Sequence, residues 1–411
     1  MKTGRHISKC QICNADLHQF LSLGHHAVTQ QYLTDKSLNQ EETLYPMNLC
    51  RCHKCGLIQL DYIVDPKIVF AENYPYRTGL TNMLIRNFEN LAESATKAFE
   101  LPKSGLIIDI GSNDGSLLKP FRKRGFEVLG VEPTDAAKDA NHDGIKTIQA
   151  FFNKNMARKI LKTSGKATLI TCTNTFAHID HSHELVTAIK LLMDDRTVFV
   201  SESQYLFDII AKTEFDTVYH EHLRFYSLLP LAKLFEMNGM TLVDAEKIGA
   251  AGGSIRVYAM KGNKEKSRRL IDLIAAEKSA GLYEKATYEN YANKVLGAKF
   301  DLVALLLTLK KKGAEIAGLT SSARSNSLLS TCKIDNHILS YLGEKNGSPK
   351  IGLYTPGTHI PVVSEDEIIK KQPPYLLVLS WHIGDELISI MKKAGYKGKF
   401  IIPLPVAKIV E

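Results

Sequence analysis

Two pairs of cysteines near the start of the chain have the spacing of metal ligands. Cys10 and Cys13 form one Cys-x-x-Cys pair, and Cys52 and Cys55 form the other. Each pair allows a tight turn to direct two thiolates at one ion, and four thiolates complete the tetrahedral coordination sphere that Zn²⁺ prefers. The sequence therefore predicts a structural zinc site with these four residues as ligands.

The choice of ligands in the second pair stays open. Cys50 and His53 are rivals to Cys52, since only a preference for the Cys-x-x-Cys geometry separates them. Free thiols or a redox pair are the alternative to a metal site. Five of the seven cysteines lie in the first 55 residues, and this clustering favours a metal over a framework of disulfides.

A glycine loop follows the apolar run 106–110, which we interpret as a buried strand. Gly111 and Gly115 allow positive φ angles and a close approach of a ligand to the backbone. Asp109 precedes the loop, and Glu132 ends the next predicted strand, where it can accept hydrogen bonds from ribose hydroxyls. The spacing G-x-x-x-G between two acidic strand ends favours S-adenosylmethionine over NAD. An ordinary turn between a strand and a helix is the alternative.

Other residues are expected at the same edge of this sheet. Asn113 belongs to the loop itself, and Asn174 ends the fourth predicted strand, 169–174. Ala150 and Phe151 follow the third strand, where they could flank an adenine. Ligands of open α/β sheets bind at the carboxyl ends of the strands, so all four are predicted cofactor contacts.

One short segment is dense in titratable groups between aromatic residues: Asp216, Tyr219, His220, Glu221 and His222. A histidine with its ordinary pKa of about 6.5 can remove a proton next to a carbonyl group, and a tyrosine hydroxyl can donate to the resulting enolate oxygen. A helix end with a solvated polar face would explain the same residues. From the residues alone, the choice stays open.

The pattern along the chain indicates several α/β parts. With 411 residues and 44% hydrophobic content, the chain exceeds one compact domain. Strands are expected at 315–319, 349–354, 375–379 and 398–402, with a helix at 385–394; residues 264–309 read as helix with a charged face. We expect an α/β protein with a zinc-binding domain at 1–68, a methyltransferase domain at 69–265, a helical linker at 266–312 and a C-terminal domain at 313–411.

Composition limits the classes of partner. No apolar run approaches the roughly 18 residues that a membrane span needs, and the basic start has no apolar segment behind it. The net charge of +8 comes from scattered lysines and arginines without a basic stripe. We therefore expect a cytoplasmic protein that binds neither membrane nor nucleic acid, and we expect a monomer.

Taken together, these motifs resemble the zinc-containing sugar C-methyltransferases, the family whose members build branched deoxysugars such as mycarose and tetronitrose. The resemblance covers nearly the whole chain. It rests on the four cysteines followed by Gly-Leu-Ile-Gln-Leu (56–60), Asn73-Tyr74-Pro75-Tyr76, the loop 109–115, Asn174-Thr175 with His178, Phe215-Asp216, Tyr219-His220-Glu221-His222, Gly252-Gly253-Ser254-Ile255-Arg256 and the segment 354–361.

The resemblance implies a small zinc-binding domain, a central Rossmann-like class I methyltransferase domain and a C-terminal Rossmann-like α/β domain. It also implies S-adenosylmethionine as cofactor and a nucleoside-diphosphate 4-ketosugar as substrate. His222 matches the family's general base, with Tyr219 and Glu221 beside it. The residues expected to contact the substrate are Tyr76, His178, Arg256, Arg324, Tyr354 and His359.

One departure concerns the turn 318–326, which is poorer in glycine than in the family, so the nucleotide could bind differently there. Arg324 is expected to meet a diphosphate. The predicted reaction removes a proton next to the ketone and methylates the enolate carbon at C-3. The alternatives are O- or N-methylation of another small molecule, and a zinc-ribbon binding protein whose methyltransferase domain is degenerate.

Overall fold

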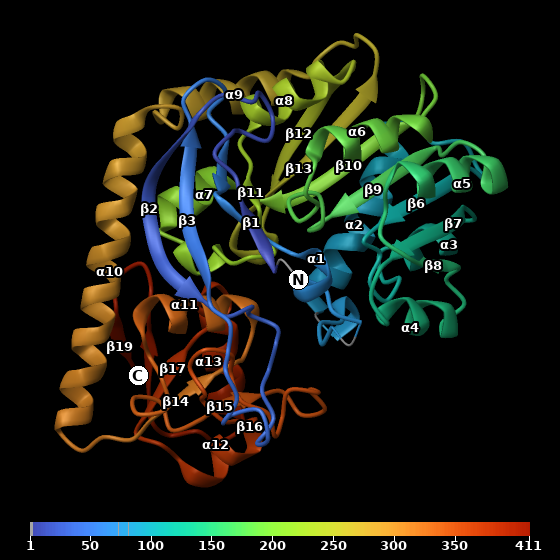
Figure 1. Cartoon of the computed structure of the whole chain (residues 1–411). Helices are drawn as coiled ribbons and strands as arrows, with labels where there is room; N and C mark the ends of the chain where they lie inside the picture. Colours follow the sequence, from blue (N-terminus) through green and yellow to red (C-terminus); the bar gives the residue numbers. More distant parts are fainter. Residues whose placement is uncertain (1–2, 73, 81) are drawn as a thin grey trace.

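The computed structural model describes residues 3–72, 74–80 and 82–411. Asn73 of the motif at 73–76 lies outside these ranges. In Figure 1 the central sheet lies on the right, the N-terminal strands cross the middle, and the C-terminal part lies below them. None of the helices in the described ranges is long and apolar enough to cross a membrane.

The N-terminal strands form an antiparallel sheet that also includes one strand from the middle of the chain. Its order is β11-β4-β3-β2. Strand β11 begins two residues after His222, so this sheet holds the end of the segment 219–222. The strands are β2 Leu17–His26, β3 Tyr45–Cys52, β4 Ile58–Leu60 and β11 Arg224–Phe225; β1 Gly4–His6 pairs separately with β5 Tyr62–Val64.

The central sheet has the order β12-β13-β10-β9-β6-β7-β8 within the described residues. Strands β8, β7, β6, β9 and β10 are parallel, whereas β13 runs antiparallel between β10 and β12. The strands are β6 Leu106–Ile110, β7 Glu127–Glu132, β8 Thr147–Gln149, β9 Leu169–Thr173, β10 Val198–Gln204, β12 Met240–Ile248 and β13 Ser254–Lys261. The predicted Rossmann-like fold is confirmed.

Helices cover both faces of this sheet because its strands are apolar on both sides. In β6, Ile108 and Ile110 pack into one core with α5, α6 and α8, while Ile107 packs into another with α2, α3 and α4. The elements are α1 Pro66–Val69, η1 Thr78–Leu80, α2 Asn82–Ala98, α3 Leu118–Lys123, α4 Ala136–His142, α5 Lys154–Ser164, α6 Ser182–Leu191, α7 Leu206–Lys212, η2 Phe215–Thr217, α8 Leu228–Met237 and η3 Ala250–Gly252.

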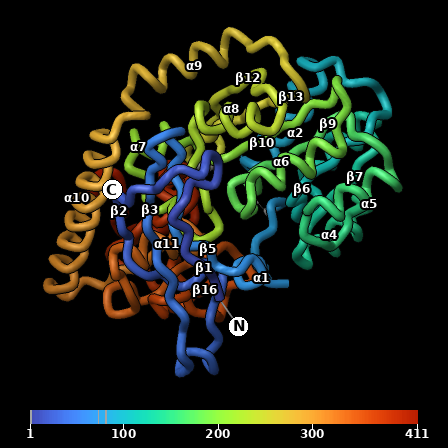
Figure 2. The backbone as a smooth tube through the Cα atoms, turned by 45° about the horizontal axis from the view of Figure 1, so that its top comes forward, coloured from blue at the N-terminus to red at the C-terminus, as the bar shows by residue number. Residues whose placement is uncertain are grey.

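The charged stretch expected as helix at 264–309 forms two helices. Helix α9 (Arg268–Ser279) starts at Ser267, whose hydroxyl accepts from the Leu270 amide, and α10 spans Lys285–Lys311. Gly281 between them has a φ of +67°, which ends the first helix. Figure 2 shows α9 passing over the central part and α10 descending along one side.

The C-terminal sheet has the order β16-β15-β14-β17-β18-β19, parallel except for the last strand. The predicted strand at 349–354 is wrong. Gly352 there has a φ of +85°, which interrupts an extended run, and Tyr354 forms only isolated bridges. The elements are β14 Ile316–Leu319, α11 Ala323–Cys332, β15 Leu342–Glu344, β16 Val362–Ser364, α12 Glu365–Lys371, β17 Tyr375–Val378, η4 Trp381–Ile383, α13 Gly384–Lys393, β18 Lys399–Ile402 and β19 Lys408–Val410.

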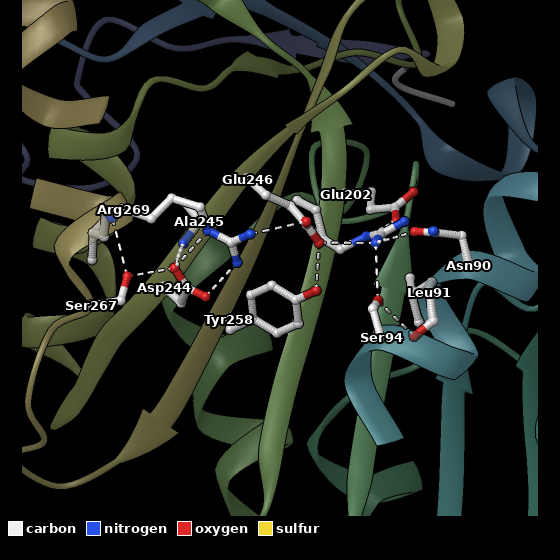
Figure 3. A network of polar contacts seen from close by, with 12 residues as sticks. Asn90, Leu91, Ser94, Glu202, Asp244, Ala245, Glu246, Tyr258, Ser267 and Arg269 are labelled. Carbon is white, nitrogen blue, oxygen red and sulfur yellow. Dashed lines mark hydrogen bonds and ion pairs between the residues drawn. The ribbon is translucent and has the colours of Figure 1, made fainter. Parts of the chain in front are cut away.

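A buried arginine, Arg256, fastens helix α2 to the central sheet. Figure 3 shows the network of polar contacts to which Glu202, Glu246 and Asn90 belong. The Arg256 side chain on β13 is fully buried and forms ion pairs with Glu202 on β10 and Glu246 on β12. Its guanidinium also donates to the side chains of Asn87 and Asn90 on α2. Arg256 therefore joins three strands and one helix.

Loss of this guanidinium should destabilise the protein. Arg256→Ala leaves the buried Glu202 carboxylate without its cation, which costs about 3–5 kcal/mol for a broken buried pair. Arg269→Ala is the control, because Arg269 is half-exposed in the same network and its pairs contribute below about 1 kcal/mol. Urea unfolding followed by circular dichroism measures both. Equal shifts of the two midpoints would contradict a special role for the buried pair.

Candidate active site and zinc centre

A cavity of about 1160 Å³ lies between the carboxyl edge of the central sheet and the C-terminal part. It brings together most of the predicted site residues. Those that line it are Asp109, Gly111, Asn113, Glu132, Phe151, Asn174, Tyr76, His178, Tyr219, Glu221, His222 and Arg324. Those that are absent from its lining are Gly115, Ala150, Arg256, Tyr354 and His359. The individual roles of all these residues stay predictions.

The glycine loop brings backbone up to this cavity. Gly111 has a φ of +75°, and a Cβ atom there would lie 2.3 Å from the Thr175 hydroxyl, so no other residue fits. Gly115 also has a positive φ, of +74°, but it packs against Ile145. Gly115 therefore shapes the turn, whereas Gly111 gives a ligand access to the main chain.

Glu132 is fixed at the end of β7 by three donors. Its carboxylate accepts from the amides of Asn113 and Thr134, both at 2.9 Å, and from the Thr134 hydroxyl at 2.7 Å. A carboxylate offers about four acceptor positions, so one direction remains for a ligand hydroxyl. This arrangement fits the ribose of S-adenosylmethionine. The exposed ring of Phe151 lines the same cavity. Ala150 does not line it, and its amide donates to the Glu132 carbonyl.

Asp109 provides a second buried carboxylate at the next strand end. Its Oδ1 atom accepts a hydrogen bond of 2.7 Å from the Thr171 hydroxyl. Burial raises the pKa of Asp109 to about 7. A cationic ligand beside it would stabilise the ionised form. The loop, Glu132 and Asp109 together fit a ligand that carries both hydroxyl groups and positive charge.

The orientation of His222 follows from one hydrogen bond. Its Nδ1 atom lies 2.7 Å from the carbonyl oxygen of Thr217. A carbonyl oxygen only accepts, so Nδ1 carries the hydrogen in the neutral ring and Nε2 keeps its lone pair. Burial lowers the pKa of His222 to about 4, so the ring is neutral near pH 7. Nε2 can therefore act as a base.

Aromatic rings enclose His222 on two sides. The ring centre of Tyr219 lies 4.0 Å away and that of His178 lies 5.0 Å away. His178 in turn stacks on Phe70. Burial raises the pKa of Tyr219 well above 10 and lowers that of His178 well below 6.5. Tyr219 is thus a protonated donor near neutral pH, and His178 is uncharged.

Glu221 points toward the N-terminal part of the chain. Its carboxylate accepts from the Tyr74 hydroxyl at 2.6 Å and from the Thr29 hydroxyl at 3.4 Å. Burial raises the pKa of Glu221 to about 7 and that of Tyr76 to about 12. Sequence reasoning missed Thr29 as a neighbour of this site, because nothing local signals a contact 192 residues away.

Arg324 lies at the start of α11 and faces an acidic pair. Its Nε and Nη2 atoms donate to the two oxygens of Asp216, at 2.8 and 3.0 Å. Glu214 is 3.5 Å from the guanidinium, and burial raises the pKa of that carboxyl group to about 7. The indole nitrogen of Trp381 also donates to Asp216. Arg324, which the sequence predicts to bind a phosphate group, therefore forms an ion pair with a carboxylate of the protein itself.

Two further residues expected at the substrate contact the N-terminal part instead. His359 has a φ of +53° and its Nε2 atom lies 3.0 Å from Glu42. Tyr354 bridges to Leu33 and to Pro361 through the backbone. Both residues attach the C-terminal part to the loop that joins β2 and β3.

The four predicted zinc ligands converge. The sulfur atoms of Cys10, Cys13, Cys52 and Cys55 all lie within 4.8 Å of one another. Four thiolates at this separation fit tetrahedral Zn²⁺. Cys50 lies outside the cluster, and burial raises the pKa of its thiol to about 12, which keeps it protonated.

The turn between Cys10 and Cys13, which we call the zinc turn, also contacts the central part beside the cavity. Gln11 lies between two of the ligands, and its side chain accepts from Arg224 and donates to Asp180. The carbonyl of Gln11 accepts from Ser182, and that of Ile12 lies 2.7 Å from His183. The zinc turn therefore packs against residues 180–183 of the central part.

Substitution of single cysteines tests the ligand set. Cys52→Ser should lose zinc, because three thiolates leave the tetrahedral sphere incomplete. Cys50→Ser is the matched control, a buried cysteine two residues away, and should retain about one ion per chain as in the unaltered protein. Metal analysis of protein purified without chelator measures both. Zinc loss in Cys50→Ser alone would overturn the assignment.

The raised pKa of Glu221 predicts a pH-dependent stability. An ordinary glutamate titrates near pH 4.3 in the unfolded chain, whereas burial raises the pKa of Glu221 to about 7. Its contribution is therefore present below about pH 4 and is lost as pH rises through about 7. Glu221→Gln titrates in neither state. Its free energy of unfolding relative to wild type should rise by about 2–3 kcal/mol between pH 5 and pH 8. A constant difference in urea unfolding would contradict the buried, protonated carboxyl group.

Three family descriptions match consecutive parts of the chain. Residues 10–70 match "Putative zinc binding domain", residues 83–245 match "Methyltransferase domain", and residues 249–405 match "C-methyltransferase C-terminal domain". Among curated proteins, the C-methyltransferase NovU of Streptomyces niveus is 28% identical over 411 residues, which cover 99% of this chain and 97% of the relative.

Two other likenesses are partial. An uncharacterized methyltransferase of Alkaliphilus oremlandii is 25% identical over 147 residues, and the match spans 33% of this chain and 66% of that protein. The structure of magnesium protoporphyrin IX methyltransferase from Synechocystis PCC 6803 is 13% identical, covering 43% of this chain and 79% of that one at a TM-score of 0.33.

The cofactor set agrees with the geometry. The cysteine cluster is a zinc site, and the glycine loop with Glu132 belongs to a domain that uses S-adenosylmethionine. The chain is an S-adenosylmethionine-dependent methyltransferase with a zinc-binding domain, and the full-length relative together with the three matches in this order supports the family of zinc-containing C-methyltransferases.

Proposed function

We propose that this enzyme removes a proton from the carbon next to the ketone of a nucleoside-diphosphate 4-ketosugar and methylates that carbon, C-3, during the synthesis of a branched deoxysugar. The observation that carries the proposal is the neutral His222 ring, whose Nδ1 is bound to the Thr217 carbonyl, in the cavity that the glycine loop also lines. A base with a free Nε2 is what enolisation requires.

The neighbouring residues supply the other half of the proton chemistry. His222 Nε2 accepts the proton from the carbon, and a tyrosine hydroxyl donates a hydrogen bond to the enolate oxygen. Tyr219 and Tyr76 line the cavity, and burial raises the pKa of both, so both hydroxyl groups stay protonated. Bound S-adenosylmethionine supplies an electrophilic methyl group that the enolate carbon accepts.

The size and walls of the cavity support a large substrate. Its volume of about 1160 Å³ exceeds the roughly 300–1,000 Å³ typical of a site for one small ligand. The C-terminal part contributes the turn 320–322, the start of α11, and Lys350, whose ammonium group donates to the Ser321 carbonyl. A lysine beside a helix N-terminus is suited to a diphosphate.

Methylation of oxygen or nitrogen is the alternative chemistry. It also needs a base, but it needs no donor for an enolate oxygen. The name of the full-length relative supports transfer to carbon. The scaffold alternative is not retained, since the chain belongs to an enzyme family and keeps Gly111, Asp109 and Glu132 in a site that fits the cofactor.

Replacement of His222 tests the proposal. A panel of nucleoside-diphosphate 4-ketosugars is incubated with enzyme and S-adenosylmethionine in water and in deuterium oxide. The masses of the sugars are then measured by mass spectrometry. The unaltered enzyme should add one methylene unit to a ketosugar. His222→Gln should slow this by about 10²–10⁴-fold, the usual contribution of a general base. Its affinity for S-adenosylmethionine should change less than about twofold, since Gln keeps a hydrogen-bonding group at that place.

The control is His142→Gln, because the His142 side chain is 90% exposed and does not line the cavity. It should behave like the unaltered enzyme. Unaltered turnover in His222→Gln would remove His222 as base. No mass gain on any ketosugar with the unaltered enzyme, together with methylation of an alcohol or amine, would overturn the substrate class.

A further inference from the structure

Helix α11 of the C-terminal part is packed against the segment that carries His222. Its first turns present two side chains, three residues apart, to that segment. The Arg324 guanidinium forms a two-pronged contact with the Asp216 carboxylate, and the Ser327 hydroxyl donates to the Val218 carbonyl at 2.5 Å. The two contacts bracket Thr217, the residue whose carbonyl receives the His222 hydrogen bond.

The Arg324 contact is buried and geometrically specific. The Arg324 side chain is 7% exposed and that of Asp216 is not exposed. Trp381 closes the contact from the third side, because its indole nitrogen donates to Asp216 at 3.1 Å and its ring lies 5.8 Å from the guanidinium. A planar guanidinium matches both carboxylate oxygens, whereas a lysine ammonium matches one.

Thr217 is also held from its own side. Its amide and hydroxyl both donate to the Glu214 carbonyl, at 3.2 and 2.8 Å. The short helix η2 (Phe215–Thr217) is therefore fixed by its internal bonds and, through Asp216, by Arg324. With η2 in place, the Thr217 carbonyl is directed at His222 Nδ1, and the bond length is 2.7 Å. A shift of η2 would release the ring.

We propose that Arg324 is a positioning residue for His222. It acts through Asp216 and the Thr217 carbonyl to hold the imidazole as the Nδ1–H tautomer, with Nε2 left as the base. The inference rests on the proposed function only for what the base does. It assigns Arg324 an internal role in place of direct contact with the diphosphate of a substrate.

The test reads the tautomer of His222 directly. Protein labelled with ¹⁵N in its histidine rings is saturated with S-adenosylmethionine, and the His222 signals are assigned by their loss in His222→Gln. The unaltered enzyme should show one tautomer with hydrogen on Nδ1. Arg324→Lys and Asp216→Asn should show a mixture of tautomers, since each breaks the two-pronged contact while keeping the approximate volume.

Arg256→Lys is the matched control, because Arg256 is an equally buried arginine between carboxylates but lies outside the cavity lining. Its His222 signals should match those of the unaltered enzyme. Zinc content and a cooperative unfolding transition establish that each variant is folded. With two positioning variants, the failure of one to fold leaves the other to decide.

Kinetics with a ketosugar substrate separate positioning from binding. Arg324→Lys should lower kcat by about 10- to 100-fold, since a misplaced base costs that much, and should leave the KM for the sugar within about threefold. A raised sugar KM with kcat and tautomer unchanged would overturn the proposal in favour of a phosphate ligand. A single Nδ1–H tautomer in both variants would overturn it as well. If no ketosugar is turned over at all, the proposed function fails, and the tautomer measurement still decides the role of Arg324.

Discussion

The site depends on the way one peptide segment is held between sheets. Leu223 directly follows His222, and its amide donates to the Ala177 carbonyl of the central part at 3.1 Å. Its carbonyl accepts from the Leu60 amide of the N-terminal sheet at 3.0 Å. One residue therefore connects both parts immediately beside the histidine. On the other side of the histidine, Arg324 ties the same segment to the C-terminal part through Asp216.

The zinc site is connected to the same segment through Arg224. Arg224, next to Leu223, donates to the side chain of Gln11 in the zinc turn and to the carbonyls of Phe176 and Ile179. None of the four cysteines that would hold the metal lines the cavity, and four thiolates leave no open position for a substrate, so the site fits a structural ion. The four cysteines would hold the metal at the turn against which Asp180, Ser182 and Arg224 are packed. A small domain with little core of its own needs such a constraint.

Local sequence predicted the features that depend on neighbours in the chain. The apolar runs that became β6 and β9 are buried at every position, and strand ends placed Asp109 and Glu132 without further information. The zinc pairs were predicted because the ligands of each pair lie three residues apart. The strand predicted at 349–354 was wrong because the prediction followed the apolar residues of this run. The positive φ of Gly352 interrupts the extended backbone there. The domain boundaries at residues 68, 265 and 312 stay predictions.

Contacts between distant segments could not be predicted in this way. Arg256 stood in a recognisable motif and Arg324 in a turn that departs from the family's pattern, yet the structure gives each a buried carboxylate as partner from another part of the chain. Thr29 donates to Glu221, which lies 192 residues further along the chain. Family resemblance placed Tyr76, His178 and Tyr219 near the cavity, but the tautomer of His222 depends on the Thr217 carbonyl and needed coordinates.

The central claim is that the segment around His222 serves the methylation of a carbon atom next to a ketone. The most direct measurement is carbon-13 NMR of the product formed from a nucleoside-diphosphate 4-ketosugar and S-adenosylmethionine labelled in its methyl group. The account predicts that the labelled methyl group is bonded to a ring carbon that correlates with the adjacent carbonyl or its hydrate. A labelled methyl group bonded to oxygen or nitrogen would contradict it.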